Sequence, residues 1–465
     1  MTLQNYPLQK VLAVAKIHPF YKPAVQYPPD LETIRTIQEQ SAEEQSTSAA
    51  FKSQPLLHKK DLYTSIERLV NDTSPQNTYR HNVYASITGG GFGAKPLFFG
   101  TDVQENRRHR AQFGELLRAT GVVSHGDWIL TTHCSGELYR SLDLMLEILE
   151  NGGASVLSAG NHMSPEEVIH LLIKYHINVL TSDSSQVAQI IFNISRLPQE
   201  SRDLLKLDKI IYTSEVLTAA QRAHIKAVLG NNVKICSVMG SAEAGPWALS
   251  NPDLTGEEIR PGEADFIFDT RAMLVEILSP SLAEGDSDPD PVPEGQNGIV
   301  VQTSLSRLRN PLVRYNTGDI GSLRPLPTQA KSLLPEDYWP FLRVLRFQGR
   351  DRRFSFDWDG EYLNFADLTA LMNNEDCGVL QWQVILDKLP QSLESTLEIR
   401  LLRSSQTDGL LSEKDLTERI RTFVHAYSAN DHRFRLTLVH NLDGFERSAT
   451  GRKVVKFIDR YCDAV

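Results

Sequence analysis

The sequence contains little cysteine. Its 465 residues include four, Cys134, Cys236, Cys377 and Cys462, which lie far apart and form no CxxC pair. This usage argues against a disulfide framework and a zinc site, and it favours a reducing compartment. No stretch approaches the roughly 18 consecutive apolar residues of a membrane span. The N-terminus also lacks the cationic start and long apolar run of a signal peptide. We therefore expect a cytoplasmic protein with no membrane span.

An excess of positive charge is absent as well. The chain has 48 lysines and arginines against 58 aspartates and glutamates, which gives a net charge of −10. A broad nucleic-acid surface needs clustered basic residues, so we expect no nucleic-acid partner, although this balance still allows a local basic pocket for a nucleotide. At this length two or three domains are expected.

The order of the predicted elements indicates an α/β fold. Between residues 102 and 235, helices alternate with short apolar strands, which predicts a parallel sheet with helices on its faces. Residues 264–350 contain short strands separated by Pro, Gly and Asp, which predicts a β-rich subdomain. We therefore predict a large N-terminal domain over residues 1–348, with parallel or mixed sheets flanked by helices, and a small α+β domain over residues 349–465.

The first segment that carries chemistry is Ser86–Pro96 (SITGGGFGAKP), which lies between two predicted strands. Glycine lets the backbone approach a phosphate and point successive N–H groups at it, while Ser86, Thr88 and Lys95 add donors and one positive charge. The segment has no Gly-Lys-Ser/Thr, so it is no P-loop. A strand rather than a helix follows it, which argues against a dinucleotide fingerprint. An ordinary glycine-rich hairpin remains the alternative.

Two further segments place an acidic residue in a turn. In Val238–Gly245 (VMGSAEAG), Glu243 follows a predicted strand. It would suit Mg²⁺ bridging phosphate oxygens, since magnesium prefers one or two carboxylates plus substrate phosphates. In RYNTGD, the carboxylate of Asp319 would accept both hydroxyls of a ribose. Taken alone, each residue has a plainer interpretation as a turn carboxylate.

A basic tail completes the set. In Arg447–Lys456 (RSATGRKVVK), Arg452 and Lys453 follow a glycine, and such a tail would bring a cation to a developing negative charge. A solvated basic loop is the alternative when the tail is considered by itself. The order of the segments therefore matters more than any single match.

In this order the segments resemble the motifs of the adenylate-forming superfamily of acyl-CoA synthetases, adenylation domains and luciferases, and most of all the phenylacetate–CoA ligase group. The superfamily's Ser/Thr/Gly-rich loop looks like Ser86–Pro96, and its Tyr-Gly-x-x-Glu looks like Met239–Glu243. Its Tyr-x-Thr-Gly-Asp looks like Tyr315–Asp319, and its Gly-Arg hinge looks like Gly349–Arg350. The subgroup's Gly-Ala-Glu adenine loop looks like Thr213–Glu215. The resemblance extends over nearly the whole chain.

This resemblance implies a two-step activity. ATP and a small carboxylic acid, aryl or medium-sized, would give an acyl-adenylate and pyrophosphate. An acceptor, usually the thiol of coenzyme A, would then displace AMP. The implied cofactors are therefore ATP, Mg²⁺ and coenzyme A. The small domain would be mobile and would rotate about the hinge between the two steps.

The resemblance also assigns roles to the matching residues. The phosphates would be held by the loop residues Ser86, Thr88, Gly89, Gly90, Gly91, Gly93 and Lys95. The adenosine would be contacted by Ser214, Glu215, Met239, Gly240, Ser241, Ala242, Asp319 and Arg350. Glu243 would carry Mg²⁺. The residues expected to act in catalysis are Lys453, Glu243, Lys95 and Arg452. The acyl pocket is expected to include His133, Phe92 and Trp247.

Some positions depart from the superfamily's motifs. Gly90–Phe92 replaces the central Thr-Thr pair of the loop, and each lost hydroxyl would weaken phosphate binding by roughly 1 kcal/mol. Met239 replaces the aromatic residue that stacks on adenine. In the tail, both Arg452 and Lys453 are candidates for the catalytic cation, and we favour Lys453. Arg is forked and always charged, so the two are not equivalent.

Three hypotheses stay open at this point. The first is an acid–thiol ligase that uses coenzyme A. The second keeps the adenylate but changes the acceptor to an amine or a protein-bound thiol. The third is a non-catalytic nucleotide-binding relative, given the altered loop and tail. His133 has a plainer interpretation as a hydrogen-bonded loop histidine. The acid, the pathway and the oligomeric state, a homodimer included, are not specified by the sequence.

Overall fold

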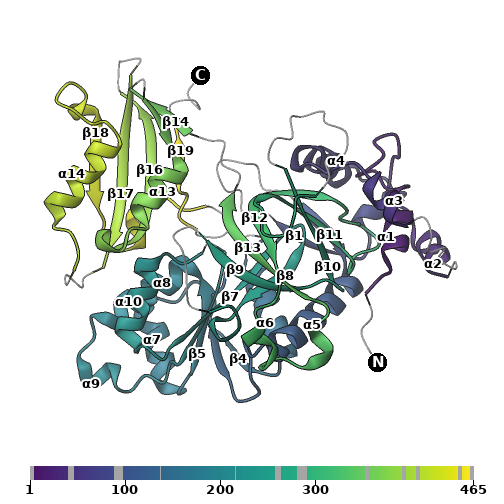
Figure 1. Ribbon diagram of the computed structural model, residues 1–465, viewed down its shortest axis with the longest axis horizontal. Helices are drawn as coiled ribbons and strands as arrows, with labels where there is room; N and C mark the ends of the chain where they lie inside the picture. Colours follow the sequence, from purple (N-terminus) through teal and green to yellow (C-terminus); the bar gives the residue numbers. More distant parts are fainter. Residues whose placement is uncertain are drawn as a thin grey trace.

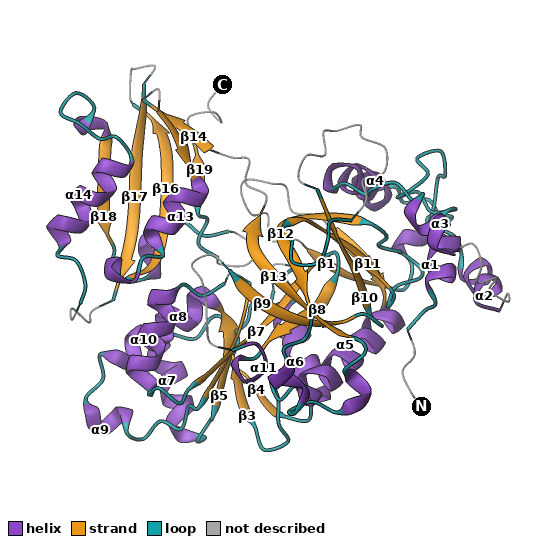
Figure 2. Cartoon of the chain, viewed as in Figure 1, coloured by secondary structure: helices purple, strands orange, loops and turns teal. Residues whose placement is uncertain are grey.

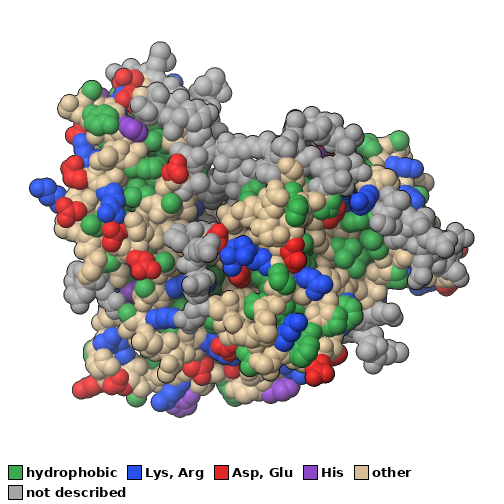
Figure 3. All heavy atoms as spheres, in the orientation of Figure 1, with side chains coloured by type: hydrophobic (Ala, Val, Ile, Leu, Met, Phe, Trp, Pro, Cys, Tyr) green, Lys and Arg blue, Asp and Glu red, His purple; other side chains and the backbone are tan. Residues whose placement is uncertain are grey.

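The structure, a computed structural model, describes residues 5–39, 47–87, 98–136, 138–214, 216–256, 263–279, 291–350, 355–359, 361–389, 394–404, 409–448 and 453–460. A large body and a smaller C-terminal unit are visible in Figure 1. None of the helices in the described ranges is long and apolar enough to cross a membrane. On the face seen in Figure 3, the described basic and acidic side chains are interspersed.

The first part of the chain is helical and leads into a β-hairpin. Its helices are α1 (Leu8–Ala15), α2 (Leu31–Glu39), α3 (Thr47–Lys52) and α4 (Lys59–Asn71). The hairpin consists of β1 (Val83–Ile87) and β2 (Phe98–Asp102), which pair antiparallel with Ser86 opposite Phe99. The two strands predicted around the glycine-rich segment are therefore confirmed.

The centre of the large body is one mixed sheet of eleven strands (Figure 2). Five neighbouring strands run parallel, as the alternating pattern predicted: β4 (Ser155–Ser158), β3 (Trp128–Thr131), β5 (Val179–Asp183), β6 (Lys209–Thr213) and β7 (Lys234–Ser241). The helices that alternate with them are α5 (Val103–Ala119), α6 (Ser141–Asn151), α7 (Pro165–Lys174), α8 (Ser184–Ser195) and α10 (Ala219–Leu229). Ile210 and Ile211 on β6 are both fully buried, because helices cover both faces of this half.

The other six strands extend the same sheet in antiparallel fashion. Their order after β7 is β8 (Gly245–Ser250), β9 (Ala264–Asp269), β13 (Leu342–Arg350), β12 (Tyr315–Arg324), β11 (Gly298–Ser304) and β10 (Met273–Leu278). The predicted β-rich region is therefore continuous with the parallel strands and is not a sheet of its own. The remaining short helices of the body are α9 (Gln199–Arg202), α11 (Pro252–Thr255) and α12 (Thr328–Lys331).

Capping side chains fix where two of the helices begin. Ser164 and Glu167 form a reciprocal capping box at the start of α7. Thr218 and Gln221 form the same arrangement at α10. Such caps typically contribute about 1 kcal/mol each. The cap at α10 ends the loop that follows β6, and this loop contains Ser214.

The C-terminal unit has its own sheet and core. A hairpin of β14 (Ser355–Trp358) and β15 (Glu361–Asn364) precedes α13 (Phe365–Met372). The sheet order is β18 (Phe434–Leu438), β17 (Ser395–Arg403), β16 (Val379–Lys388) and β19 (Phe457–Asp459), and α14 (Glu413–Phe423) packs beside it. Trp358, Leu368 and Ile399 are fully buried in this core. The domain boundary at residue 349 stays a prediction, and β13 of the large sheet runs to Arg350.

Two lysines that face each other on neighbouring strands of the large sheet allow a buried ion pair to be compared with a solvated one. Lys209 on β6 and Lys234 on β7 are partners across the two strands. Lys209 Nζ lies 2.6 Å from Asp127, and the two side chains are only 9% and 6% exposed. The side chains of the Lys234–Asp253 pair are 31% and 48% exposed.

We expect Lys209→Ala to lower the free energy of unfolding of the large domain by about 3 kcal/mol, because it leaves a buried carboxylate without its partner. Lys234→Ala should cost less than about 1 kcal/mol, since its pair is solvated. Urea unfolding of both variants measures the difference, and equal costs would contradict the argument.

Candidate active site

Several predicted site residues lie outside the described part of the chain. They are Thr88, Gly89, Gly90, Gly91, Phe92, Gly93, Lys95, Glu215 and Arg452. The backbone of Arg350 is described as part of β13, but its side chain is not. The roles given to these residues stay predictions.

Eight of the described predicted residues line one cavity of about 520 Å³. They are Ser86, His133, Ser214, Gly240, Ser241, Ala242, Glu243 and Lys453. The elements that supply them are β1, the loop after β3, the loop after β6, the β7–β8 turn and the C-terminal tail. Ser86 and Lys453, which are more than 360 residues apart in sequence, therefore line the same cavity. The cavity lies at the carboxyl ends of the parallel strands, where ligands of such sheets usually bind.

Glu243 sits in the tight turn between β7 and β8. Ser241 and Gly245 face each other across this turn, and Ser241 Oγ accepts the N–H of Ala244 at 2.9 Å. Gly245 has φ 72°, and a Cβ there would lie 3.0 Å from the His109 ring. Ser86 Oγ donates to the carbonyl of Ala242 at 3.4 Å. The turn is thus tied to the hairpin that precedes the glycine-rich segment.

The Glu243 carboxylate is held in place from within the protein. Glu243 is 5% exposed. The Tyr315 hydroxyl donates to Glu243 Oε1 at 3.1 Å, and Lys59 Nζ lies 3.9 Å from the same atom. Burial raises the pKa of Tyr315, and the Glu243 charge raises it further, so Tyr315 remains a donor to the carboxylate. Arg307 donates to the backbone carbonyl of Glu243. The first tyrosine of the YNTGD segment therefore positions the acid of the MGSAE segment.

Asp319 and Ser214 lie where the regular backbone of a strand is interrupted or ends. Asp319 on β12 is the register partner of Arg350 on β13, with a register shift before Gly321. The structure therefore brings together the two positions assigned to the ribose, although Asp319 is not a lining residue of the cavity. Ser214 follows β6 with φ 80°, a conformation that costs of order 1 kcal/mol for a non-glycine residue and is often found at ligand sites.

Two predicted residues are placed in or against the core instead. Trp247 on β8 is 5% exposed and packs edge-on against Phe268, with ring centroids 5.6 Å apart. Its position in the strand turns the indole toward the hydrophobic core. The structure therefore does not place Trp247 in the pocket, where the sequence had predicted it. Met239 packs against the same core and is not a lining residue.

His133 bridges two hydroxyl groups in the cavity wall. Its Nδ1 lies 3.0 Å from Thr131 Oγ1, and its Nε2 lies 3.1 Å from Thr213 Oγ1. Burial, and then the charge of Lys453, lower the pKa of His133 from 6.5 to about 3. His133 is therefore a neutral hydrogen-bonding residue, which agrees with its plainer interpretation and also places it at the cavity.

This pKa predicts how activity depends on pH. The folded-state value lies below the unfolded value, so His133 contributes stability above pH 6.5 that is lost as the pH falls toward 3. Between about pH 5 and 8 it stays neutral, so its titration adds no step to the pH dependence of a reaction in this cavity. We expect His133→Asn and the wild type to have pH–rate profiles of the same shape. Loss of a step near pH 6.5 in the variant would contradict this.

The C-terminal tail contributes Lys453 to the lining of the cavity. Arg447 and Val454 form an antiparallel bridge, and the N–H of Ser448 donates to the carbonyl of Lys453 at 2.8 Å. Lys453 and His133 both line the cavity, and the positive charge of Lys453 contributes to lowering the pKa of His133. Lys456, three residues later, instead donates to Gln381 and lies 4.6 Å from the centroid of the Trp382 ring.

Hydrogen bonds join the C-terminal unit to α8 and α10 beside the cavity. Gln381 Nε2 donates to Ser185 Oγ at 2.7 Å, and Gln221 donates to the carbonyl of Leu380. Ser404 Oγ lies 3.1 Å from His224 Nδ1. These contacts hold the unit in the orientation that places Lys453 in the cavity.

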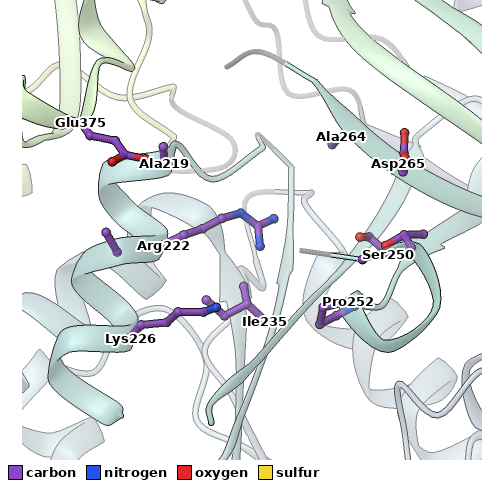
Figure 4. Close-up of a pocket in the computed structure, with 12 residues that line it drawn as sticks. Ala219, Arg222, Lys226, Ile235, Ser250, Pro252, Ala264, Asp265 and Glu375 are labelled. Carbon is purple, nitrogen blue, oxygen red and sulfur yellow. The ribbon is translucent and has the colours of Figure 1, made fainter. Parts of the chain in front are cut away.

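A second, smaller cavity of about 220 Å³ lies between α10 and the β8–β9 region (Figure 4). Arg222 and Lys226 point into it from α10, opposite Asp265, and Glu375 of the C-terminal unit lies at its rim. Arg222 already donates to the Tyr212 hydroxyl at 2.8 Å. None of the predicted site residues lines this cavity, so the candidate chemistry belongs to the larger one.

The chain resembles two proteins of known activity over part of its length. It is 24% identical over 245 residues to an indoleacetate–lysine synthetase of Pseudomonas savastanoi, which covers 52% of this chain and 53% of the relative. It is 27% identical over 168 residues to a phenylacetate–coenzyme A ligase of Thermus thermophilus, which covers 36% and 34%. The matches thus span about half and about one third of the relatives' lengths. No family model matches the chain.

Solved structures show the fold. A 2-hydroxyisobutyryl-CoA ligase, solved in its postadenylation state with an acyl-AMP, matches with a TM-score of 0.63 at 17% identity over 97% of this chain and 88% of that one. The same ligase in its thioesterification state gives a TM-score of 0.53. The chain therefore has the fold of the adenylate-forming acid–CoA ligases, with a mixed sheet and a separate smaller sheet. The predicted fold class and the resemblance to the phenylacetate–CoA ligase group are confirmed.

Proposed function

We propose that the protein activates a carboxylic acid with ATP to give an acyl-adenylate and then transfers the acyl group to an acceptor. One observation carries the proposal. A single cavity contains a buried carboxylate, Glu243, and a cationic side chain, Lys453, which come from separate parts of the chain. The activities of the partial relatives and the shared fold support the same conclusion.

The residues of the cavity fit a nucleotide and a magnesium ion. Glu243 presents one buried carboxylate in the cavity wall, and Mg²⁺ takes one or two carboxylates together with phosphate oxygens. When bound, the ion would neutralise charge on the phosphates. Ser214, Gly240 and Ser241 would contact the adenosine. Asp319 and Arg350, adjacent across two strands, would bind its ribose.

Lys453 would stabilise the negative charge that gathers where the carboxylate oxygen bonds to the α-phosphorus and pyrophosphate departs. A fixed cation in a cavity with little water stabilises such charge far more strongly than it would in solution. His133, neutral and held by two hydroxyl groups, would shape the pocket without exchanging a proton.

Coenzyme A is the acceptor that we propose, because the matched fold is that of acid–CoA ligases. The similarity to an indoleacetate–lysine synthetase favours an amine acceptor as the second candidate.

The test is product analysis. The protein is incubated with ATP, Mg²⁺ and a mixture of acids, and acyl-AMP and pyrophosphate are followed by mass spectrometry. Coenzyme A and free amines are then offered in competition. A thioester supports the proposal, and an amide moves it to the second candidate. Retained ATP binding without any pyrophosphate release would identify a non-catalytic nucleotide-binding protein instead.

A further inference from the structure

Helix α4 contributes to the large cavity a lysine that was not among the site residues predicted from the sequence. Lys59 and Tyr63, one turn apart on α4, both line the cavity. Lys59 Nζ lies 3.9 Å from Glu243 Oε1 and 5.2 Å from the centroid of the Tyr63 ring. The ammonium group therefore lies at the cavity, beside the carboxylate that the proposed function assigns to Mg²⁺.

Backbone hydrogen bonds fix the start of α4 against the YNTGD segment. Leu57, two residues before Lys59, forms a parallel bridge with Tyr315. The N–H and the carbonyl of Leu57 bond to the backbone of the residues on either side of Tyr315, at 2.9 and 3.0 Å. Because the Tyr315 hydroxyl also binds Glu243, the backbone of the lysine is fixed relative to the carboxylate. Only the side chain of Lys59 needs to move for its ammonium group to change partner.

The ion pair between Lys59 and Glu243 is loose. Its distance of 3.9 Å is longer than a hydrogen bond, and the Lys59 side chain is 46% exposed. Such a pair contributes little to stability. Arg110, another cation that lines the cavity, differs because it forms salt bridges with Glu147 at 2.7 Å and with Asp143 at 3.3 Å. Of these two cations, Lys59 is the one that can exchange its partner at little cost.

We propose that Lys59 binds the β- and γ-phosphates of ATP, and thus the pyrophosphate that leaves, by exchanging the Glu243 carboxylate for a phosphate oxygen. This inference rests on the proposed function. When Glu243 carries a metal ion, its charge is no longer available to Lys59, whereas the phosphates beside that ion retain negative charge. The flexible stem and compact ammonium group of a lysine suit such an exchange, and bonds from an ammonium group to a phosphate are charge-assisted.

Calorimetric titration of the full chain with ATP, AMP and pyrophosphate, each with Mg²⁺ and without any acid, tests this inference. We expect Lys59→Gln to weaken the binding of ATP and of pyrophosphate by about tenfold or more, and that of AMP by less than about twofold, because one charge-assisted hydrogen bond is lost. Lys59→Arg keeps the charge and should restore most of the affinity. Arg68→Gln removes a positive charge at an exposed position of the same helix, where Arg68 bonds to the carbonyl of Gln26, and should leave all three affinities unchanged.

The binding measurement separates this inference from the proposed function, because it requires no adenylation. If the expected losses appear although no acid is adenylated, the inference stands and the proposed function fails. Unchanged affinities for ATP and pyrophosphate in Lys59→Gln would overturn the inference, even in a protein that forms acyl-adenylates. An equal loss for AMP would also overturn it, since Lys59 would then act on the whole nucleotide site or on the fold. The thermal midpoint of each variant checks that it is folded.

Discussion

Lys453→Ala is expected to slow adenylation by roughly 100- to 1,000-fold, the range found when one fixed charge or donor is removed from a developing anion. The backbone next to Lys453 is anchored by the Arg447–Val454 bridge, and Lys453 lines the same cavity as His133. Removal of the ammonium group leaves the backbone of residue 453 anchored, because Ser448 donates to its carbonyl and not to its side chain. The loss should therefore appear in the rate of the chemical step more than in the binding of ATP.

Two neighbouring cations provide the controls for this experiment. Lys456→Ala should have a much smaller effect, since Lys456 lines the same cavity but its ammonium group bonds to Gln381. Arg452→Ala tests the other candidate from the sequence. A larger loss with Arg452→Ala than with Lys453→Ala would transfer the catalytic role to the arginine. Single-turnover formation of acyl-AMP is the measurement.

Glu243→Gln is expected to lower adenylation at least about 100-fold while the fold stays intact. The substitution keeps the shape of the side chain and removes the charge that would hold Mg²⁺. The surroundings of Glu243 are built for an anion, because the Tyr315 hydroxyl donates to it at 3.1 Å and Lys59 lies 3.9 Å away.

The dependence of the rate on Mg²⁺ concentration distinguishes the metal role from a structural one. A weaker metal site should raise the Mg²⁺ concentration needed for half-maximal rate, whereas a local structural fault should not change it. Tyr315→Phe is a second, less disruptive substitution, because it removes only one hydrogen bond to the Glu243 carboxylate. We expect it to lower the adenylation rate by about tenfold or less. ATP turnover that survives Glu243→Gln would exclude the magnesium role of this residue.

The sequence predicted the parallel half of the sheet well, because strands such as β5 and β6 are short apolar runs between amphipathic helices. It did not predict β8 or the course of β13. β8 begins with Gly245 and Pro246, residue types that are depleted in strands, and only pairing with β7 and β9 makes it a strand. The continuity of the two halves of the sheet depends on these pairings, which no local pattern contains.

The candidate site was predictable where a short motif carries the residue. Ser86, Ser214, Glu243 and Lys453 were all named from segments, and all line one cavity. The supporting groups were not predictable in the same way. Arg307 lies in a stretch with no distinctive spacing, and its burial in the cavity wall is a result of tertiary packing. Trp247 was predicted to line the pocket because it lies close to a motif. Side chains alternate between the two faces of its strand, and this alternation places the indole in the core instead.

The most direct test of the account is carboxylate-dependent exchange of radiolabelled pyrophosphate into ATP, measured with Mg²⁺ over a panel of aryl, aliphatic, dicarboxylic and amino acids. The account predicts exchange that requires an acid of one class, requires Mg²⁺, and falls in Lys453→Ala and Glu243→Gln. Exchange that proceeds without any acid, or an absence of exchange with every acid although ATP binds, would contradict the central claim that this cavity forms acyl-adenylates.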